Sequence, residues 1–312
     1  MARFSGSDAV GAGFRIIGKH PFAVFIWGLV YLLLTFTPLA YGYWAAWPDL
    51  MAGLHAMASR TAGDDGSAAV GALAALRLRM LPYQMLQIPL TFLAIVLVYG
   101  AVYRAVLEPR NSGGAYLRLG AQELWLFLVS VVACILAAVV LIPVVLVAVY
   151  GGRAVSNMLA PSVQWLAVLA IVVATCALVL WLAARFSLAY PMSFAEGRFR
   201  LFQSWGMTRG HGWKIVGLIL ALVLILLLIE IVVGMVVFGV VLAGIGTNWQ
   251  VMAQTATRTP EVLAGQLAPW LVGFILVYAV LIGAFHAIFV APFADIYRQL
   301  TAKPVGPADF GG

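Results

Sequence analysis

Long runs of apolar residues, separated by short polar segments, dominate the pattern of this chain. About six of these runs are long enough to cross a hydrocarbon core of about 30 Å, which requires about 20 helical residues. Lipid offers the backbone no hydrogen bonds, so runs of this length predict helices, and the alternating pattern of barrel strands is absent. The predicted spans are residues 22–46, 86–106, 124–150, 163–184, 213–243 and 269–292.

The composition agrees with lipid as the surroundings of most of the chain. Hydrophobic residues make up 64% of the 312 residues and charged residues only 9%, whereas a soluble domain carries about 25% charged residues. So few charges cannot cover a water-exposed surface of this size. The sequence therefore predicts an all-α, polytopic membrane bundle, built as a single membrane domain over residues 1–312, with short amphipathic interfacial helices.

The distribution of lysine and arginine predicts the orientation of the chain. Of the 18 such residues, 13 fall on one side of the predicted spans and five on the other. The richer side is cytoplasmic by the positive-inside rule, so both termini are expected in the cytoplasm. The first run, at 25 residues, is longer than a signal-peptide core of about 7–15 residues and predicts a retained helix. The basic residues are scattered between spans, which argues against nucleic acid as a partner.

The connections between spans also carry helical patterns. Residues 47–85 predict a helical hairpin on the outer membrane surface, folded about a turn at residues 61–67. In the second outer connection, Pro260 follows a capping threonine and predicts a helix start. Three similar segments, residues 14–18, 116–120 and 205–210, each precede an outward-going span. They suggest three copies of an interfacial helix followed by a transmembrane hairpin, with chance similarity as the alternative because glycine is common here.

The sixth span carries a ridge of small residues. Ala279, Gly283, Ala287 and Ala291 follow one another at intervals of four. Such a ridge lets another helix approach closely, so that dispersion replaces the hydrophobic effect that lipid cannot supply. We expect packing within the chain, and the alternative is a homodimer.

No catalytic or metal-binding constellation is visible. The four histidines are far apart and lack metal-ligand spacing, and the two cysteines, Cys134 and Cys176, fall inside apolar runs. No nucleophile–base pair is evident. We therefore expect a protein that is not an enzyme and that holds no metal and no cofactor.

Glu230 is the only acidic residue deep inside a predicted span. Tyr278, on the sixth span, lies at a similar depth by helix rise. One interpretation is a proton or substrate site, because ionisable groups inside the membrane are costly and often functional. The other is a buried, neutral carboxyl that is hydrogen-bonded to a neighbouring helix.

The segment before the fifth span is rich in arginine and aromatic residues. Ser193 and Glu196 match a capping box and predict the start of a helix. On that helix Arg198 and Arg209 would share the apolar, aromatic face, and Lys214 follows at the positive end of the fifth span's dipole. This pattern predicts a site for anionic lipid headgroups or phosphate. The alternative is a positive-inside anchor with no specific ligand.

The same segment carries a family resemblance. Ser204–Trp205, Thr208–Gly210 and Trp213, followed by a long apolar run, resemble the signature of the membrane domain of glycerophosphoryl diester phosphodiesterases and its uncharacterised bacterial relatives. Residues 292–298 resemble the end of that domain, and residues 116–120 resemble stand-alone members. The resemblance implies a six-helix fold in the bacterial inner membrane and a lipid-related role. It implies no phosphodiesterase activity, because only about 20 residues follow the last span.

Two functions remain open. The first is a non-catalytic membrane protein that binds anionic lipid or a partner protein. The second is a transporter or lipid-moving protein with a site near Glu230. A water-accessible midplane cavity lined by Glu230 would favour the second, and a closed, dry bundle would favour the first.

Overall fold

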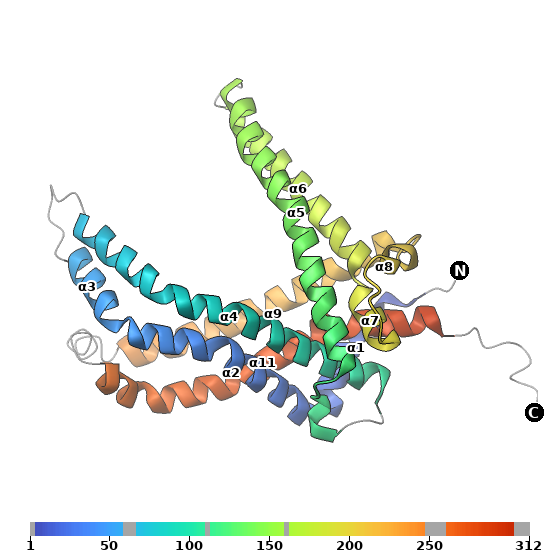
Figure 1. The fold of residues 1–312 in the computed structure, drawn as a ribbon, viewed down its shortest axis with the longest axis horizontal. Coiled ribbons are helices and arrows are strands. Elements are labelled where there is room, and N and C mark those ends of the chain that lie inside the picture. Colours follow the sequence, from blue (N-terminus) through green and yellow to red (C-terminus); the bar gives the residue numbers. More distant parts are fainter. Residues whose placement is uncertain (1–3, 59–66, 110–112, 159–161, 247–259, 303–312) are drawn as a thin grey trace, which may run out of the picture. The chain divides into compact units, whose positions relative to one another are not determined.

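The computed structural model describes residues 4–58, 67–109, 113–158, 162–246 and 260–302, and within these ranges the chain is almost wholly helical, without strands. Six helices are long and apolar enough to cross a membrane. The predicted all-α polytopic fold is thereby confirmed, and the chain is a multi-pass membrane protein. The helices are shown in Figure 1, and their bounds are α1 Gly6–Lys19, α2 Pro21–Ala45, α3 Trp47–Ala58, α4 Ser67–Leu107, η1 Gly113–Tyr116, α5 Ala121–Met158, α6 Gln164–Phe186, α7 Ala189–Glu196, α8 Gln203–Met207, α9 Gly212–Gly246 and α11 Pro260–Thr301.

The internal contacts divide the chain into two compact units. Unit 1 comprises residues 1–19, 99–224 and 286–312, and unit 2 comprises residues 20–98 and 225–285. Helices α4, α9 and α11 each contribute one part to unit 1 and another part to unit 2.

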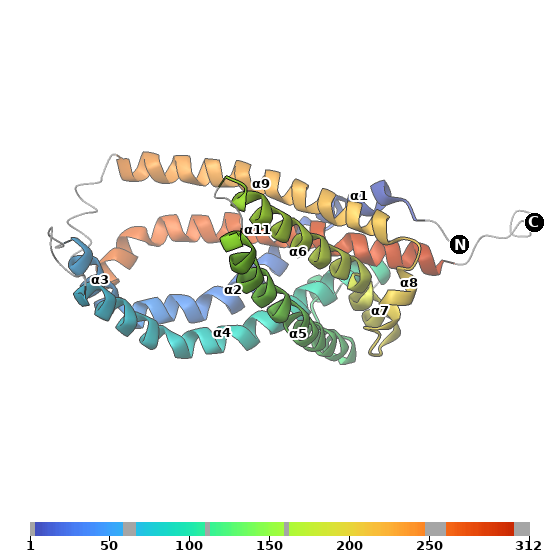
Figure 2. The same cartoon turned by 90° about the horizontal axis from the view of Figure 1, so that it is seen from above.

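Unit 2 contains the connection between α2 and α4. Helix α3 forms as predicted, and Arg79 on α4 pairs with Asp49 on α3 at 2.8 Å. The prediction of a separate second surface helix before residue 86 is wrong, because α4 continues without a break from Ser67 to Leu107. A continuous helix keeps the backbone groups bonded to one another, which apolar surroundings require. In both views α2 and α4 run side by side (Figures 1 and 2).

Glycines bring α2 and α11 into close contact inside unit 2. A β-carbon on Gly28 would lie 1.7 Å from the Ala279 carbonyl oxygen, and one on Gly283 would lie 1.9 Å from the Val24 carbonyl oxygen. No side chain larger than hydrogen fits such distances. The small-residue ridge of α11 therefore packs within the chain, as predicted.

Unit 1 is built around the hairpin of α5 and α6, with the short helices α7 and α8 following the end of α6 (Figure 2). Each of the three transmembrane hairpins of the chain is preceded by a short segment, namely α1, η1 and the α7–α8 pair. Only α1 is a sustained helix, with 14 residues, whereas η1 has four residues and α8 has five. Three copies of an interfacial helix are therefore not seen in these lengths, and the repeat stays a prediction with chance similarity as its alternative.

Candidate functional site

An apolar pocket lies between α5, α6 and the segment that leads into α8, all within unit 1. Its volume is about 380 Å³, which falls in the range of about 300–1,000 Å³ that small-molecule sites occupy. Every lining side chain is apolar or aromatic: Ala133, Leu136, Ala137, Val140, Leu141, Val179, Leu182, Ala183, Phe186, Leu201, Phe202 and Trp205. Such a pocket accepts a hydrocarbon group rather than a polar ligand.

Small side chains account for the space. Ala133 and Ala137 on α5 and Ala183 on α6 leave room between the two helices, which larger residues would fill. Leu201 closes one side and is itself buried against Val129 and other apolar residues of the unit 1 core. The pocket thus lies between two apolar helices, each long enough to cross a membrane.

Two buried hydroxyl groups attach α8 to the end of α6. The Ser204 hydroxyl donates to the Arg185 carbonyl oxygen at 2.8 Å, and the Thr208 hydroxyl approaches the same oxygen at 3.4 Å. The last carbonyls of a helix lack partners within the helix, so these hydroxyls satisfy one of them. Ser204 and Thr208 belong to the segment that carries the family resemblance. Their bonds fix Trp205, which lies between them in sequence, at the edge of the pocket.

Arg185 lies against Trp205 and Trp181. Its guanidinium carbon is 5.4 Å from the ring centroid of Trp181 and 5.4 Å from that of Trp205. The two indoles meet edge to face, with centroids 5.0 Å apart. Both contacts are cation–π interactions, which hold the cation beside the aromatic faces. Arg185 was not among the predicted site residues, although the spacing of four between Trp181 and Arg185 on one helix was a usable signal.

The three cations that the sequence analysis proposed for anion binding are all exposed. Arg198, Arg209 and Lys214 lie at the surface, and their side chains make no ion pair or hydrogen bond with residues in the ranges that the structure describes. Together with Arg185 and Arg200 they give five basic residues between positions 185 and 214, against the single carboxylate of Glu196. This segment is therefore strongly positive beside an apolar pocket.

The predicted amphipathic helix through Arg198 and Arg209 is wrong. Helix α7 begins at Ala189 and ends at Glu196, so Ser193 lies inside it and does not cap it. Gly197, with φ of +59°, ends α7 in the left-handed conformation that favours glycine at helix ends. Arg198 follows this break, whereas Arg209 follows α8.

Ser193 and Glu196 instead hold the turn that follows α7. The Ser193 hydroxyl accepts the backbone N–H of Arg200 at 2.9 Å. The Glu196 carboxylate pairs with the Arg200 side chain at 2.7 Å. Arg200 is therefore paired with Glu196. Within the described residues, neither Arg198 nor Arg209 forms an ion pair with this carboxylate.

Glu230 is exposed on α9 in unit 2, so the predicted burial of this carboxyl is wrong. Its neighbours Leu227, Leu228 and Ile231 are exposed as well. Depth along a helix follows from the sequence, but the direction in which a side chain points depends on the helices packed around it. Tyr278 is half-buried and stacks on Phe274 with centroids 5.3 Å apart.

A buried ion pair lies elsewhere in unit 1. Arg104, near the end of α4, pairs with Glu123 in the first turn of α5, and each residue is only 3% exposed. Arg104 also donates to the Tyr116 carbonyl oxygen at 2.9 Å, and Glu123 accepts the Gly120 N–H at 2.9 Å. The second bond is the carboxylate half of a capping box at the start of α5. The pair is fully bonded within the protein, which fits a structural role.

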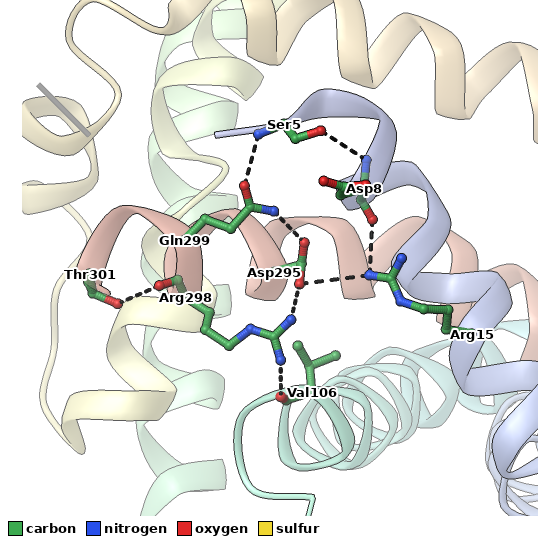
Figure 3. Close-up of polar contacts among 8 residues, drawn as sticks. All are labelled: Ser5, Asp8, Arg15, Val106, Asp295, Arg298, Gln299 and Thr301. Carbon is green, nitrogen blue, oxygen red and sulfur yellow. Dashed lines mark hydrogen bonds and ion pairs between the residues drawn. The ribbon is translucent and has the colours of Figure 1, made fainter. Parts of the chain in front are cut away.

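A second buried acid, Asp295, organises the end of α11 in unit 1 (Figure 3). Its carboxylate pairs with Arg298 and accepts a bond from the Gln299 amide at 2.7 Å. Arg15 of α1 lies 3.9 Å from the same carboxylate. Gln299 in turn accepts the backbone N–H of Ser5 at 2.8 Å. These contacts tie α1 to α11, and they involve the residues that resemble the end of the family domain.

Groups of three or more metal-ligating side chains are absent from the described ranges, and Cys134 and Cys176 are free and exposed. Comparison of the chain with known protein families, with curated proteins and with solved structures gives no match. The arginine-flanked pocket of unit 1 is therefore the candidate site on its own geometry.

Proposed function

We propose that this chain is a non-catalytic protein of the bacterial inner membrane that binds an anionic phospholipid in the pocket of unit 1. One acyl chain occupies the apolar space between α5 and α6, and the headgroup lies toward the basic segment of residues 185–214. The termini face the cytoplasm in this proposal, as the distribution of lysine and arginine predicts. The resemblance to the membrane domain of glycerophosphoryl diester phosphodiesterases agrees with a lipid-related role.

The main support for the proposal is that Trp205 contacts both an apolar pocket and a cation. Its indole lines the apolar pocket and also contacts the Arg185 guanidinium. A phospholipid joins a hydrocarbon chain to a charged phosphate in one molecule, so it matches both contacts at once. Tryptophan is also the residue that favours the boundary between hydrocarbon and headgroups.

The alternative, a transporter or lipid-moving protein with a site near Glu230, has less support. Its carboxyl is exposed on α9, with apolar neighbours that are exposed too. A partner protein is the second candidate ligand. The exposed Glu230 carboxyl on the apolar helix α9 could hydrogen-bond to a polar side chain on a helix of that partner.

The test is to fill the pocket. Ala183→Phe places an aromatic ring among the lining residues, so the variant should lose co-purified phosphatidylglycerol and cardiolipin, measured by mass spectrometry after extensive detergent washing. Ala177→Phe is the matched control, because Ala177 lies on the same helix, is exposed and does not line the pocket. Equal lipid retention by Ala183→Phe, Ala177→Phe and the native chain would contradict the proposal.

A further inference from the structure

We infer that Arg185 is the phosphate-binding residue of this site and that its ligand is a phosphodiester anion. The guanidinium would donate to the phosphate oxygens of the lipid whose acyl chain fills the pocket. This inference rests on the lipid function proposed above. It assigns the headgroup contact to a residue that the sequence pattern did not single out.

The first observation is that Arg185 has donors without acceptors. Its Nε and Nη1 atoms are buried and make no hydrogen bond with any residue in the described ranges. Buried donors are nearly always paired in native proteins, because an unpaired donor loses its bonds to water without replacement. The cation–π contacts with Trp181 and Trp205 hold the guanidinium in place but do not accept its in-plane N–H groups. A ligand with oxygen acceptors would complete the site.

The second observation is the charge around Arg185. A β-carbon added to Gly212, the first residue of α9, would lie 3.9 Å from the guanidinium carbon of Arg185. The start of a long helix carries a partial positive charge, which repels a neighbouring cation. Lys214 adds another positive charge in the first turn of the same helix. The carboxylate of Glu196 is already paired with Arg200. An anion beside Arg185 would relieve this repulsion.

The third observation selects phosphate among anions. A guanidinium offers a planar fork of donors that matches two oxygens of a phosphate at once. The backbone N–H groups at the start of α9 suit the same ligand. The pocket that Trp205 lines adds a place for a hydrocarbon chain. A phosphodiester that is attached to an acyl chain and carries a net negative charge satisfies all three features. Phosphatidylcholine does not, since its choline would bring a further cation to a positive segment.

The experiment compares Arg185→Lys and Arg185→Gln with the native chain. Arg118→Gln is the control, because Arg118 is an exposed arginine of unit 1 outside the pocket. Binding is measured in nanodiscs of phosphatidylglycerol mixed with phosphatidylcholine, by counting each lipid that stays bound in native mass spectrometry. Glycerol 3-phosphate, which has the phosphate but no acyl chain, is tested separately by calorimetry in detergent. Thermal unfolding in detergent checks that each variant is folded.

We expect both Arg185 variants to retain at least about tenfold less phosphatidylglycerol than the native chain, because charged hydrogen bonds to its phosphate are lost, while Arg118→Gln retains the native amount. If a folded Arg185→Gln variant retains the native amount of phosphatidylglycerol, Arg185 is not the phosphate contact, and the Ala183→Phe test alone then decides on the lipid site. If glycerol 3-phosphate binds in an Arg185-dependent way but no lipid is retained, the phosphate site stands and the lipid function fails. If the native chain retains neither ligand, both proposals are overturned.

Discussion

Arg104 is a charged side chain that the fold buries almost completely. Its partners come from η1, α5 and α7. Its guanidinium meets the Glu123 carboxylate and the Tyr116 carbonyl, and it lies 5.4 Å from the centroid of the Phe194 ring. Gly100 makes room for the acid, since a β-carbon there would lie 2.6 Å from a Glu123 carboxylate oxygen. The pair therefore needs both of its members and the glycine beside them.

Removing one member of this pair should destabilise the protein strongly. Glu123→Ala leaves the Arg104 charge buried without its partner, and we expect a loss of about 3–5 kcal/mol in the free energy of unfolding. Glu196→Ala is the control, because it breaks the more exposed Glu196–Arg200 pair and should cost about 0–1 kcal/mol. Denaturant-induced unfolding in detergent micelles measures both. A similar small effect for the two variants would show that Glu123 is not needed to hold Arg104.

Between elements, the closest contact described in unit 2 is the one between α2 and α11. The two backbones meet at Gly28 and Gly283, at distances that leave no room for a side chain. Contact of this kind replaces hydrophobic attraction in lipid, where apolar side chains gain nothing by leaving the solvent. Other helices of the chain contain glycines with open space around them, so glycine alone does not identify a contact.

Gly28→Ala should therefore push α2 and α11 apart and destabilise the protein. The added carbon would lie 1.7 Å from a backbone oxygen, which no rotation of a side chain relieves. Gly273→Ala on α11 is the control, since nothing lies within 4 Å of its added carbon. Alanine is the better helix former by about 0.5–1 kcal/mol, so the control should be neutral or stabilising. Melting temperatures in detergent distinguish the two, and equal values would contradict the close contact.

For the whole molecule, six apolar helices and the distribution of charge predict one topology. An even number of spans places both termini on the same side, and the 13 lysines and arginines on that side predict that it is the cytoplasm. In this predicted topology the basic segment before α9 faces the cytoplasm. A lipid bound in the pocket of unit 1 would belong to the inner leaflet.

Reporter fusions test this topology. Alkaline phosphatase fused after Gly152 or Gly246 should be active, since both positions lie outside the cytoplasm in the six-span topology. Fusions after Gly113 or Gly312 should be inactive, and a cytoplasmic reporter at the same positions should give the opposite pattern. An active phosphatase after Gly312 would place the C-terminus outside and overturn the even number of spans.

The sequence by itself determined the number of apolar helices and the all-α class. These features depend on the length of each apolar run, which is a property of neighbouring residues. The close packing of Gly283 was also predictable, because the spacing of small residues along one helix is local as well. The start of α11 at Pro260 follows from the same kind of local signal.

The tertiary structure decided what depends on residues far apart in the sequence. The sequence assigned Glu230 to a long apolar helix, but its exposure followed from which helices surround α9. The helix expected after Ser193 ends at Gly197, where the chain turns back and bonds to the serine itself. The contact between Arg185 and Trp205 depends on the hydroxyls of Ser204 and Thr208, which attach α8 to the end of α6. Periodicity assigns a residue to a helix, whereas the groups that meet its side chain are set by packing between distant segments.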